Sequence, residues 1–316
     1  MTRAVVLTGL MTVLSVSTPL FASETDQFSN RMMPVQDSAE ILDRRVNEVI
    51  AAIAADWRGK PDQRRFVKKI YKKLGGFHWV DKLERWVMES DQVDRLEVHR
   101  RDSIYAGHPI WSIRITGFTG VGPSIRVDDT LFGSDKIGHF FSQGRKFYHR
   151  WLRTGNEARA ARWSALTEKV LFGQFFTGSY SNADLVANYE GHRFYRSLFE
   201  DNIIPGKPAI LVWQKEQWQV QRPFSWTDHI NDLWDEALHP NHFGRLLRPH
   251  MIKRLKTFCD EYRSEPAAYT IQNETALFLR YQHLGLRDTR DIRLSAICHE
   301  DDHTADNVSE VSGVAG

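Results

Sequence analysis

The sequence predicts a mainly α-helical protein, with a helical bundle core over about residues 134–200, flanking helices and a minor β element. Apolar residues recur at three- and four-residue spacing in most segments, which is typical of amphipathic helices. Strict alternation of apolar and polar residues occurs in the short stretch 110–116, which predicts a half-buried strand. Glycines and a proline within residues 117–123 then predict a loop. Residues 209–213 and 218–220 are expected to pair as a small hairpin.

Capping residues, prolines and glycines delimit the expected helices. The first helix is expected to begin after Asp37 or Ser38, and the second near Pro61, a favoured first-turn residue. Gly75 and Gly76 end the second helix. The expected helices cover about residues 38–57, 61–74, 80–88, 134–153, 157–176, 181–200, 226–238, 249–263 and 274–284.

The first 22 residues have the three-part pattern of a secretory signal peptide. Arg3 precedes an apolar run from Ala4 to about Val16, and Ala22 supplies a small residue for cleavage. This run is shorter than the roughly 20 apolar residues that a membrane-spanning helix needs, and no later stretch is apolar enough. We therefore expect a soluble periplasmic or secreted protein of the cell envelope, with no transmembrane segment in the mature chain.

The remaining chain divides by composition. Residues 23–37 are polar and predict a linker, residues 38–290 a single helix-rich globular domain, and residues 291–316 a disordered tail. The formal net charge of +2 is nearly balanced and does not indicate binding to nucleic acid. Cys259 and Cys298 would pair in an oxidising compartment or remain two separate thiols, and the sequence leaves both alternatives open.

Polar residues with helical spacing form the most informative group. Asp135 and His139 are four residues apart, as are Asp184 and Asn188, so each pair shares a helix face. Glu168 lies between them in sequence, on a helix whose other residues are mainly apolar. A buried carboxylate needs a partner, and three helices that each bring one can satisfy the others. The same side chains would also suit a divalent metal such as zinc, manganese or magnesium.

Two functions are consistent with this group. In the first, it is a buried polar network in a non-catalytic envelope-maintenance or binding protein. The alternative is a metal-assisted hydrolase that acts on a cell-envelope component. Asp135, His139 and Asp184 would then bind the ion, Glu168 would be the general base, and Asn188 would orient the substrate. The sequence favours the first function, because it fixes no complete catalytic set, and it does not identify the lipid, glycan or protein partner.

Other motifs give weaker predictions. Asp235, His239 and His242 would ligate a metal at a helix end or, as the sequence favours, cap that end. The stretch 298–303 contains Cys, His and acidic residues, and a disordered polar tail is favoured there over a metal-binding one. The sequence contains no P-loop, Gly-x-Ser-x-Gly, His-Glu-x-x-His or dinucleotide-binding motif, so serine-nucleophile chemistry is unsupported.

The stretch Asp-Lys-Ile-Gly-His-Phe, a later Glu, and Ser-x-x-Asp-Leu-x-x-Asn within 181–191 resemble the YfiM-like family of predicted bacterial envelope lipoproteins. The Asp-Lys-x-x-His element is also similar to the VanZ-like membrane proteins associated with glycopeptide resistance. The resemblance covers about residues 130–200 and implies an envelope location. The chain differs in lacking a lipidation cysteine and in its long flanking helical segments. The matched positions are Asp135, Lys136, His139, Glu168, Asp184, Asn188 and Gly191.

Overall fold

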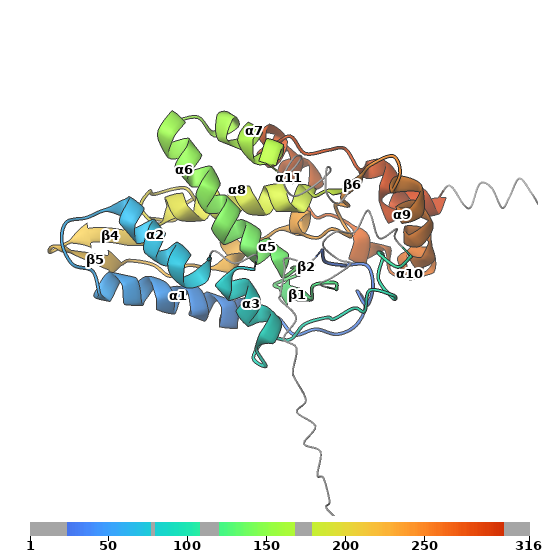
Figure 1. Cartoon of the computed structure of the whole chain (residues 1–316), viewed down its shortest axis with the longest axis horizontal. Helices are drawn as coiled ribbons and strands as arrows, with labels where there is room; N and C mark the ends of the chain where they lie inside the picture. The colour runs from blue at the N-terminus through green and yellow to red at the C-terminus, as the bar shows by residue number, and fades with distance from the viewer. Residues whose placement is uncertain (1–23, 77–79, 108–119, 168–178, 300–316) are drawn as a thin grey trace, which may run out of the picture.

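Helices dominate the computed structural model, which describes residues 24–76, 80–107, 120–167 and 179–299 (Figure 1). The mainly α fold class is therefore confirmed. The helical elements are α1 (Ala39–Ala55), α2 (Gln63–Leu74), α3 (Lys82–Glu89), α5 (Asp135–Gly138), the π-helical turn η2 (His139–Gln143), α6 (Gly144–Thr154), α7 (Glu157–Thr167), α8 (Asn182–Ser197), α9 (Arg248–Leu255), α10 (Cys259–Ser264) and α11 (Glu274–Tyr281). Across the described ranges, no helix is long and apolar enough to cross a membrane.

Strands in the described residues form three short antiparallel pairs. They are β1 (Ser124–Val127) with β2 (Thr130–Gly133), β3 (Ser179–Tyr180) with β6 (His242–Phe243), and β4 (Leu211–Gln214) with β5 (Gln217–Val220). The pair β4–β5 confirms the predicted hairpin.

Side-chain caps set where the helices begin. The carboxylate of Asp62 accepts a hydrogen bond from the backbone N–H of Arg65 (2.9 Å), so α2 begins directly after Asp62. Ser181 caps α8 in the same way, because its hydroxyl accepts from the backbone N–H of Asp184 (3.1 Å). Both caps place the helices within two residues of their predicted starts.

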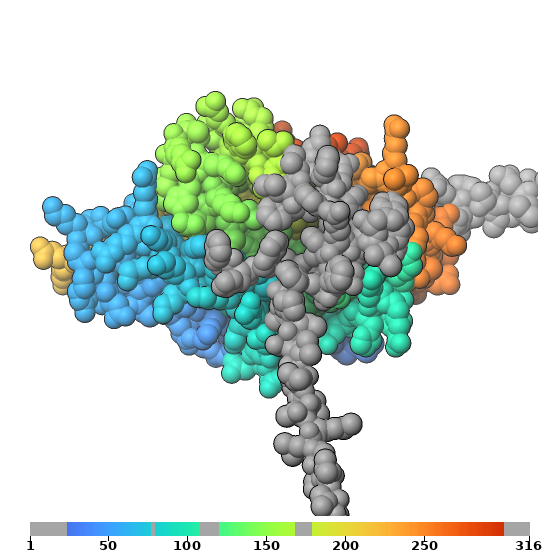
Figure 2. Space-filling view, in the orientation of Figure 1, coloured from blue at the N-terminus to red at the C-terminus, as the bar shows by residue number. Residues whose placement is uncertain are grey.

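Helix α8 runs through the middle of the molecule, and nearly all of its residues are buried (Figure 1). Helices α6 and α7 pack against it, and the run α5–η2–α6 crosses it. Gly144 and Gly191 lie at this crossing, where a Cβ atom added to Gly144 would be 2.6 Å from the Cα atom of Gly191. The helices of the predicted bundle core therefore touch backbone to backbone. In the space-filling view, α2 and the pair α6–α7 form neighbouring parts of one face (Figure 2).

The predicted helix over residues 226–238 is wrong. The structure instead has two single 3₁₀ turns, η4 (Trp226–Asp228) and η5 (Asp232–Trp234). The side chain of Asn231 accepts from the backbone N–H of Leu233 (3.1 Å), and Asp235 does the same for Ala237 (2.8 Å). These short polar side chains compete with the helical hydrogen bonds and bend the chain at each step.

The hairpin β1–β2 was not predicted from the sequence. All its residues except Arg126 are buried, so the apolar and polar alternation of a half-buried strand is absent. The strand predicted over 110–116 lies outside the described residues.

Residues 25–29 are buried, which corrects this part of the linker predicted over 23–37. Asp26 is central to this packing. Its carboxylate accepts hydrogen bonds from the backbone N–H groups of Phe28 (2.8 Å) and Ile104 (2.9 Å). The polar residues that predict a linker by composition instead satisfy backbone groups inside the fold.

Residues 291–299 are packed against the domain, which corrects the disordered tail predicted from residue 291. The buried apolar side chains of this segment are Ile292, Leu294 and Ile297. Cys298 forms a disulfide with Cys259, with the two Cα atoms 5.4 Å apart. A cross-link over 39 residues is expected to stabilise the fold by about 3–4 kcal/mol. Residues 300–316 lie outside the described part of the chain.

Candidate metal centre

The three predicted metal ligands, Asp135, His139 and Asp184, come together in the structure. Asp135 and His139 lie one turn apart on the run α5–η2, which Ser134 separates from the end of β2. Asp184 faces them from the first turn of α8, and its Oδ2 atom is 3.1 Å from Nε2 of His139. One ligand atom from each residue lies within 4.8 Å of the others. The group could therefore hold a metal ion.

Asn188 fixes the orientation of the His139 ring. Its side-chain nitrogen donates to Oγ of Ser164 (3.2 Å), and its carbonyl oxygen faces Nδ1 of His139 at 3.1 Å. Nδ1 therefore carries a proton and donates a hydrogen bond to the carbonyl oxygen of Asn188. The other ring nitrogen, Nε2, points at the Asp184 carboxylate, and a bare lone pair there would face a negative oxygen. A proton or a metal ion must therefore lie between His139 and Asp184.

Lys136 lies at the centre of the cluster and is 1% exposed. Its Nζ atom is 2.6 Å from Oδ2 of Asp135, 2.7 Å from Oδ1 of Asp184 and 2.7 Å from Oε1 of Glu236. Burial lowers the pKa of Lys136, but the three carboxylates outweigh it and raise the pKa well above its usual value. Lys136 is therefore charged and neutralises part of the cluster. Ser181 also donates to Glu236 (3.0 Å).

Further carboxyl groups make the surroundings of Lys136 strongly acidic. Burial raises the pKa of Glu24 to about 8, and the charge of Glu236 adds to this shift. Burial likewise raises the pKa of Glu84 well above its usual value, with Asp135 adding to it. The pKa of Glu236 rises to about 7, again through burial first. Protons or a bound cation must balance the negative charge that one lysine leaves uncompensated.

Of the two predicted catalytic residues, the structure describes Asn188 but not Glu168. Glu168, the predicted general base, lies outside the described residues. Asn188 is 3% exposed, and its amide is bonded to His139 on one side and Ser164 on the other. It is thus placed to orient His139, whereas the sequence predicted that it orients a substrate.

The weaker predicted group of Asp235, His239 and His242 does not form an ion site. Asp235 is paired with Arg31 (2.8 Å), and the His239 ring contacts the amide of Asn182 (3.1 Å). Within the part of the chain that the structure describes, the Asp135 group is the one whose ligand atoms lie close enough to share an ion.

A second buried ion cluster lies further along α8. Glu190 is fully buried and accepts hydrogen bonds from Arg193 (2.9 Å) and from the hydroxyl of Tyr281 (2.7 Å). Its carboxylate is also 3.1 Å from Nδ1 of His229. These contacts join α11 and the segment after η4 to α8, which is a structural role.

No protein-family model, no curated protein and no solved structure matches this chain. The resemblance to the YfiM-like and VanZ-like families over residues 130–200 therefore stays a prediction. The function has to be inferred from the geometry of the cluster.

Asp81 connects α3 to the helical run that carries His139. Both of its carboxylate oxygens accept from Oγ of Ser142, at 2.7 and 2.6 Å. Burial raises its pKa to about 7, although the hydrogen bond from Ser142 opposes this shift. The folded protein therefore keeps a proton on Asp81 that the unfolded chain releases above its ordinary pKa of 3.8.

We expect Asp81 to make the protein less stable as the pH rises from about 4 to about 7. In that range the folded state binds more protons than the unfolded state, so each pH unit lowers the free energy of unfolding by at most about 1.4 kcal/mol. The Asp81→Asn variant should lack this part of the slope, as measured by urea unfolding at several pH values. The exposed Asp91→Asn variant is the control and should keep it. Parallel slopes for wild type and Asp81→Asn would contradict the prediction.

Proposed function

We propose that this protein is an exported, metal-dependent hydrolase of the bacterial cell envelope, with one divalent ion held by Asp135, His139 and Asp184. The observation that carries the proposal is the orientation of His139. Its Nδ1 atom donates to Asn188, and its Nε2 atom is 3.1 Å from the Asp184 carboxylate. A metal-bound histidine commonly donates its other ring N–H to an oxygen in this way.

Zinc is the ion that best fits this donor set. Zinc accepts mixed histidine and carboxylate ligands, whereas magnesium prefers oxygen ligands and calcium needs six or more of them. With three protein ligands, a bound zinc ion would keep one position for water and would supply the acidified water that hydrolysis needs. The side chains of Asp135, His139 and Asp184 are 13%, 18% and 10% exposed, so solvent reaches all three.

An envelope location is part of the same proposal. It is supported by the signal-peptide pattern of residues 1–22 and by the disulfide between Cys259 and Cys298, which is typical of proteins in oxidising compartments. The substrate would be an envelope component with a hydrolysable bond.

A second candidate function is favoured by the contacts of Lys136. Its Nζ atom lies within 2.7 Å of three carboxylates, so it neutralises part of the cluster without a metal. In this case a proton lies between His139 and Asp184. The cluster would then be a packing network in a non-catalytic envelope-maintenance or binding protein.

Zinc binding to metal-free protein distinguishes the two candidates. We expect calorimetric titration to give one zinc ion per chain for the wild type. His139→Gln and Asp184→Asn should each weaken binding by about tenfold or more, because each removes a ligand. The control is His192→Gln, which alters another histidine–carboxylate contact of α8, with Glu157 (3.3 Å), and should bind zinc like the wild type.

Absence of zinc binding would support the second candidate function. If the wild type binds no zinc, and His139→Gln and Asp184→Asn only lower the melting temperature, the cluster is a packing network. Elemental analysis of protein purified from the bacterial periplasm then serves as an independent check for any other bound metal.

A further inference from the structure

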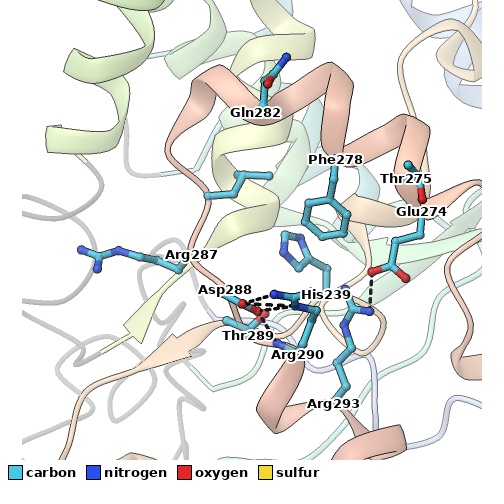
Figure 3. Close-up of a pocket in the computed structure, with 11 residues that line it drawn as sticks. His239, Glu274, Thr275, Phe278, Gln282, Arg287, Asp288, Thr289, Arg290 and Arg293 are labelled. Carbon is cyan, nitrogen blue, oxygen red and sulfur yellow. Dashed lines mark hydrogen bonds and ion pairs between the residues drawn. The ribbon is translucent and has the colours of Figure 1, made fainter.

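A cavity of about 640 Å³ lies beside α11 and the segment 286–293 (Figure 3). Its wall includes the buried His239, the apolar Phe278 and Leu286, and the cationic Arg293. The ring centroids of Phe278 and His239 are 5.2 Å apart, and the Arg293 guanidinium carbon is 5.9 Å from the Phe278 centroid. Phe278 thus packs against both polar side chains, as Figure 3 shows.

His239, a residue of the cavity wall, has an unpartnered donor. The Asn182 amide is fixed by Arg287, whose backbone N–H donates to Oδ1 (2.8 Å) and whose carbonyl accepts from Nδ2 (3.1 Å). Nδ2 of Asn182 also faces Nε2 of His239 at 3.1 Å, so Nε2 accepts. Burial lowers the pKa of His239 to about 3, which keeps the ring neutral with its proton on Nδ1. Nδ1 is buried and has no hydrogen-bond partner among the described residues, and His239 is 1% exposed.

Two neighbouring side chains in the wall have unsatisfied polar atoms as well. Arg293 uses Nη1 to bind Oε1 of Glu274 (2.7 Å), but its Nε and Nη2 atoms are buried without a hydrogen-bond partner in the described part of the chain. The hydroxyl of Thr289 is also buried without a hydrogen-bond partner among the described residues, and Thr289 is 2% exposed. Buried donors without acceptors are costly, and several of them around one cavity indicate an acceptor that is bound there.

We propose that this cavity binds the oxyanion group of a small ligand, a carboxylate or a phosphate, whose apolar part packs against Phe278 and Leu286. The Nε and Nη2 atoms of Arg293 form the two-pronged donor that planar carboxylates and phosphates accept. Nδ1–H of His239 and the hydroxyl of Thr289 add donors. The charged side chains of the wall sum to a formal charge of +1, with three arginines (Arg287, Arg290 and Arg293) against two carboxylates (Glu274 and Asp288), of which Arg290 pairs with Asp288 and Arg293 with Glu274.

This site is separate from the candidate metal centre, and the inference does not rest on the proposed function. The two sites are close in the fold, because Glu236 contacts Lys136 while His239, three residues later, lines the cavity. They share no lining residue, so anion binding should be unchanged in metal-free protein and in the His139→Gln variant, whichever function the metal centre has.

Calorimetric titration of the full chain in chelator-containing buffer tests the proposal, with inorganic phosphate, acetate and hexanoate as probes and hexanol as the uncharged control. We expect phosphate, hexanoate or both to bind, and hexanol not to bind. Binding of phosphate alone would identify a phosphate ligand. If carboxylates bind, hexanoate should bind roughly tenfold more tightly than acetate, because its chain reaches the apolar wall.

The Arg293→Lys variant keeps the positive charge but removes the two-pronged donor, so it should weaken binding by about tenfold. Thr289→Val should weaken it several-fold. The control is Arg101→Lys, at an exposed arginine, which should bind like the wild type. In the wild type, the bound anion should also shift the nitrogen-15 resonance of Nδ1 in His239, a readout that needs no variant at this site. Absence of binding by every anion, or unchanged affinity in Arg293→Lys, would overturn the proposal.

Discussion

Replacement of Lys136 by methionine should lower the free energy of unfolding by about 4 kcal/mol, a large part of the stability of an ordinary domain. The variant keeps most of the side-chain volume but removes the charge that lies within 2.7 Å of Asp135, Asp184 and Glu236. The side chains of these carboxylates are only 13%, 10% and 4% exposed, so water replaces the ammonium group only in part. Removal of one partner from a buried ion cluster costs more than the intact cluster contributes, because the remaining charges are left unpaired.

Chemical denaturation in chelator-containing buffer measures this effect. The double variant Lys136→Met with Glu236→Gln should recover part of the loss, since it removes one of the unpaired charges. Lys207→Met is the matched control. Lys207 pairs with Asp228 but its side chain is 46% exposed, and its loss should cost less than about 1 kcal/mol. A loss of similar size in Lys136→Met and Lys207→Met would show that charge pairing does not hold the cluster together.

Zinc should restore part of the stability of Lys136→Met if the proposed metal centre exists. A divalent ion on Asp135 and Asp184 supplies positive charge where the ammonium group is missing, and a ligand that binds the folded state stabilises it. The same addition should leave the double variant His139→Gln with Lys136→Met unchanged. The stability measurement thereby checks the zinc titration by an independent route.

The sequence predicts that Asp135, His139 and Asp184 lie together because each of them follows from local spacing. Asp135 and His139 are four residues apart at a helix start, and a cap at Ser181 places Asp184 in the first turn of α8. These are short-range patterns that one helix specifies by itself. Their convergence depends on the crossing of α8 with the run α5–η2–α6, of which the sequence predicts only that the helices of residues 134–200 form a bundle.

Other members of the cluster have no comparable local signal. Glu236 lies in a segment whose apolar spacing predicts a helix, and the 3₁₀ turns that bring it to Lys136 depend on side-chain caps. Thr25, which donates to Asp135 (3.2 Å), lies in a stretch whose polar composition predicts a linker. Only the family resemblance points to Lys136, because a lysine is rarely fully buried. Contacts between residues 110 or 100 positions apart follow from the tertiary fold and not from periodicity.

Gly191→Ala should destabilise the protein by about 3 kcal/mol, although alanine is the better helix former. A Cβ atom at this position would lie 1.9 Å from the carbonyl oxygen of Phe140 and 3.0 Å from the Cα atom of Gly144. Both neighbours are backbone atoms in helices and cannot rotate away, so α8 and the run η2–α6 must separate. Overpacking of this kind costs about 1–3 kcal/mol or more, which exceeds the roughly 1 kcal/mol that alanine gains over glycine in helix propensity.

The sign of the change separates packing from propensity. If helix propensity dominated, Gly191→Ala would stabilise the protein, and Ala187→Gly in the same helix would destabilise it by about 1 kcal/mol. With close packing, both variants lose stability, and Gly191→Ala loses more. Phe140 follows His139 directly in η2, so separation of the helices should also move the His139 ring from Asp184 and weaken zinc binding. Higher stability of Gly191→Ala in urea unfolding would mean that the helices do not touch at this crossing.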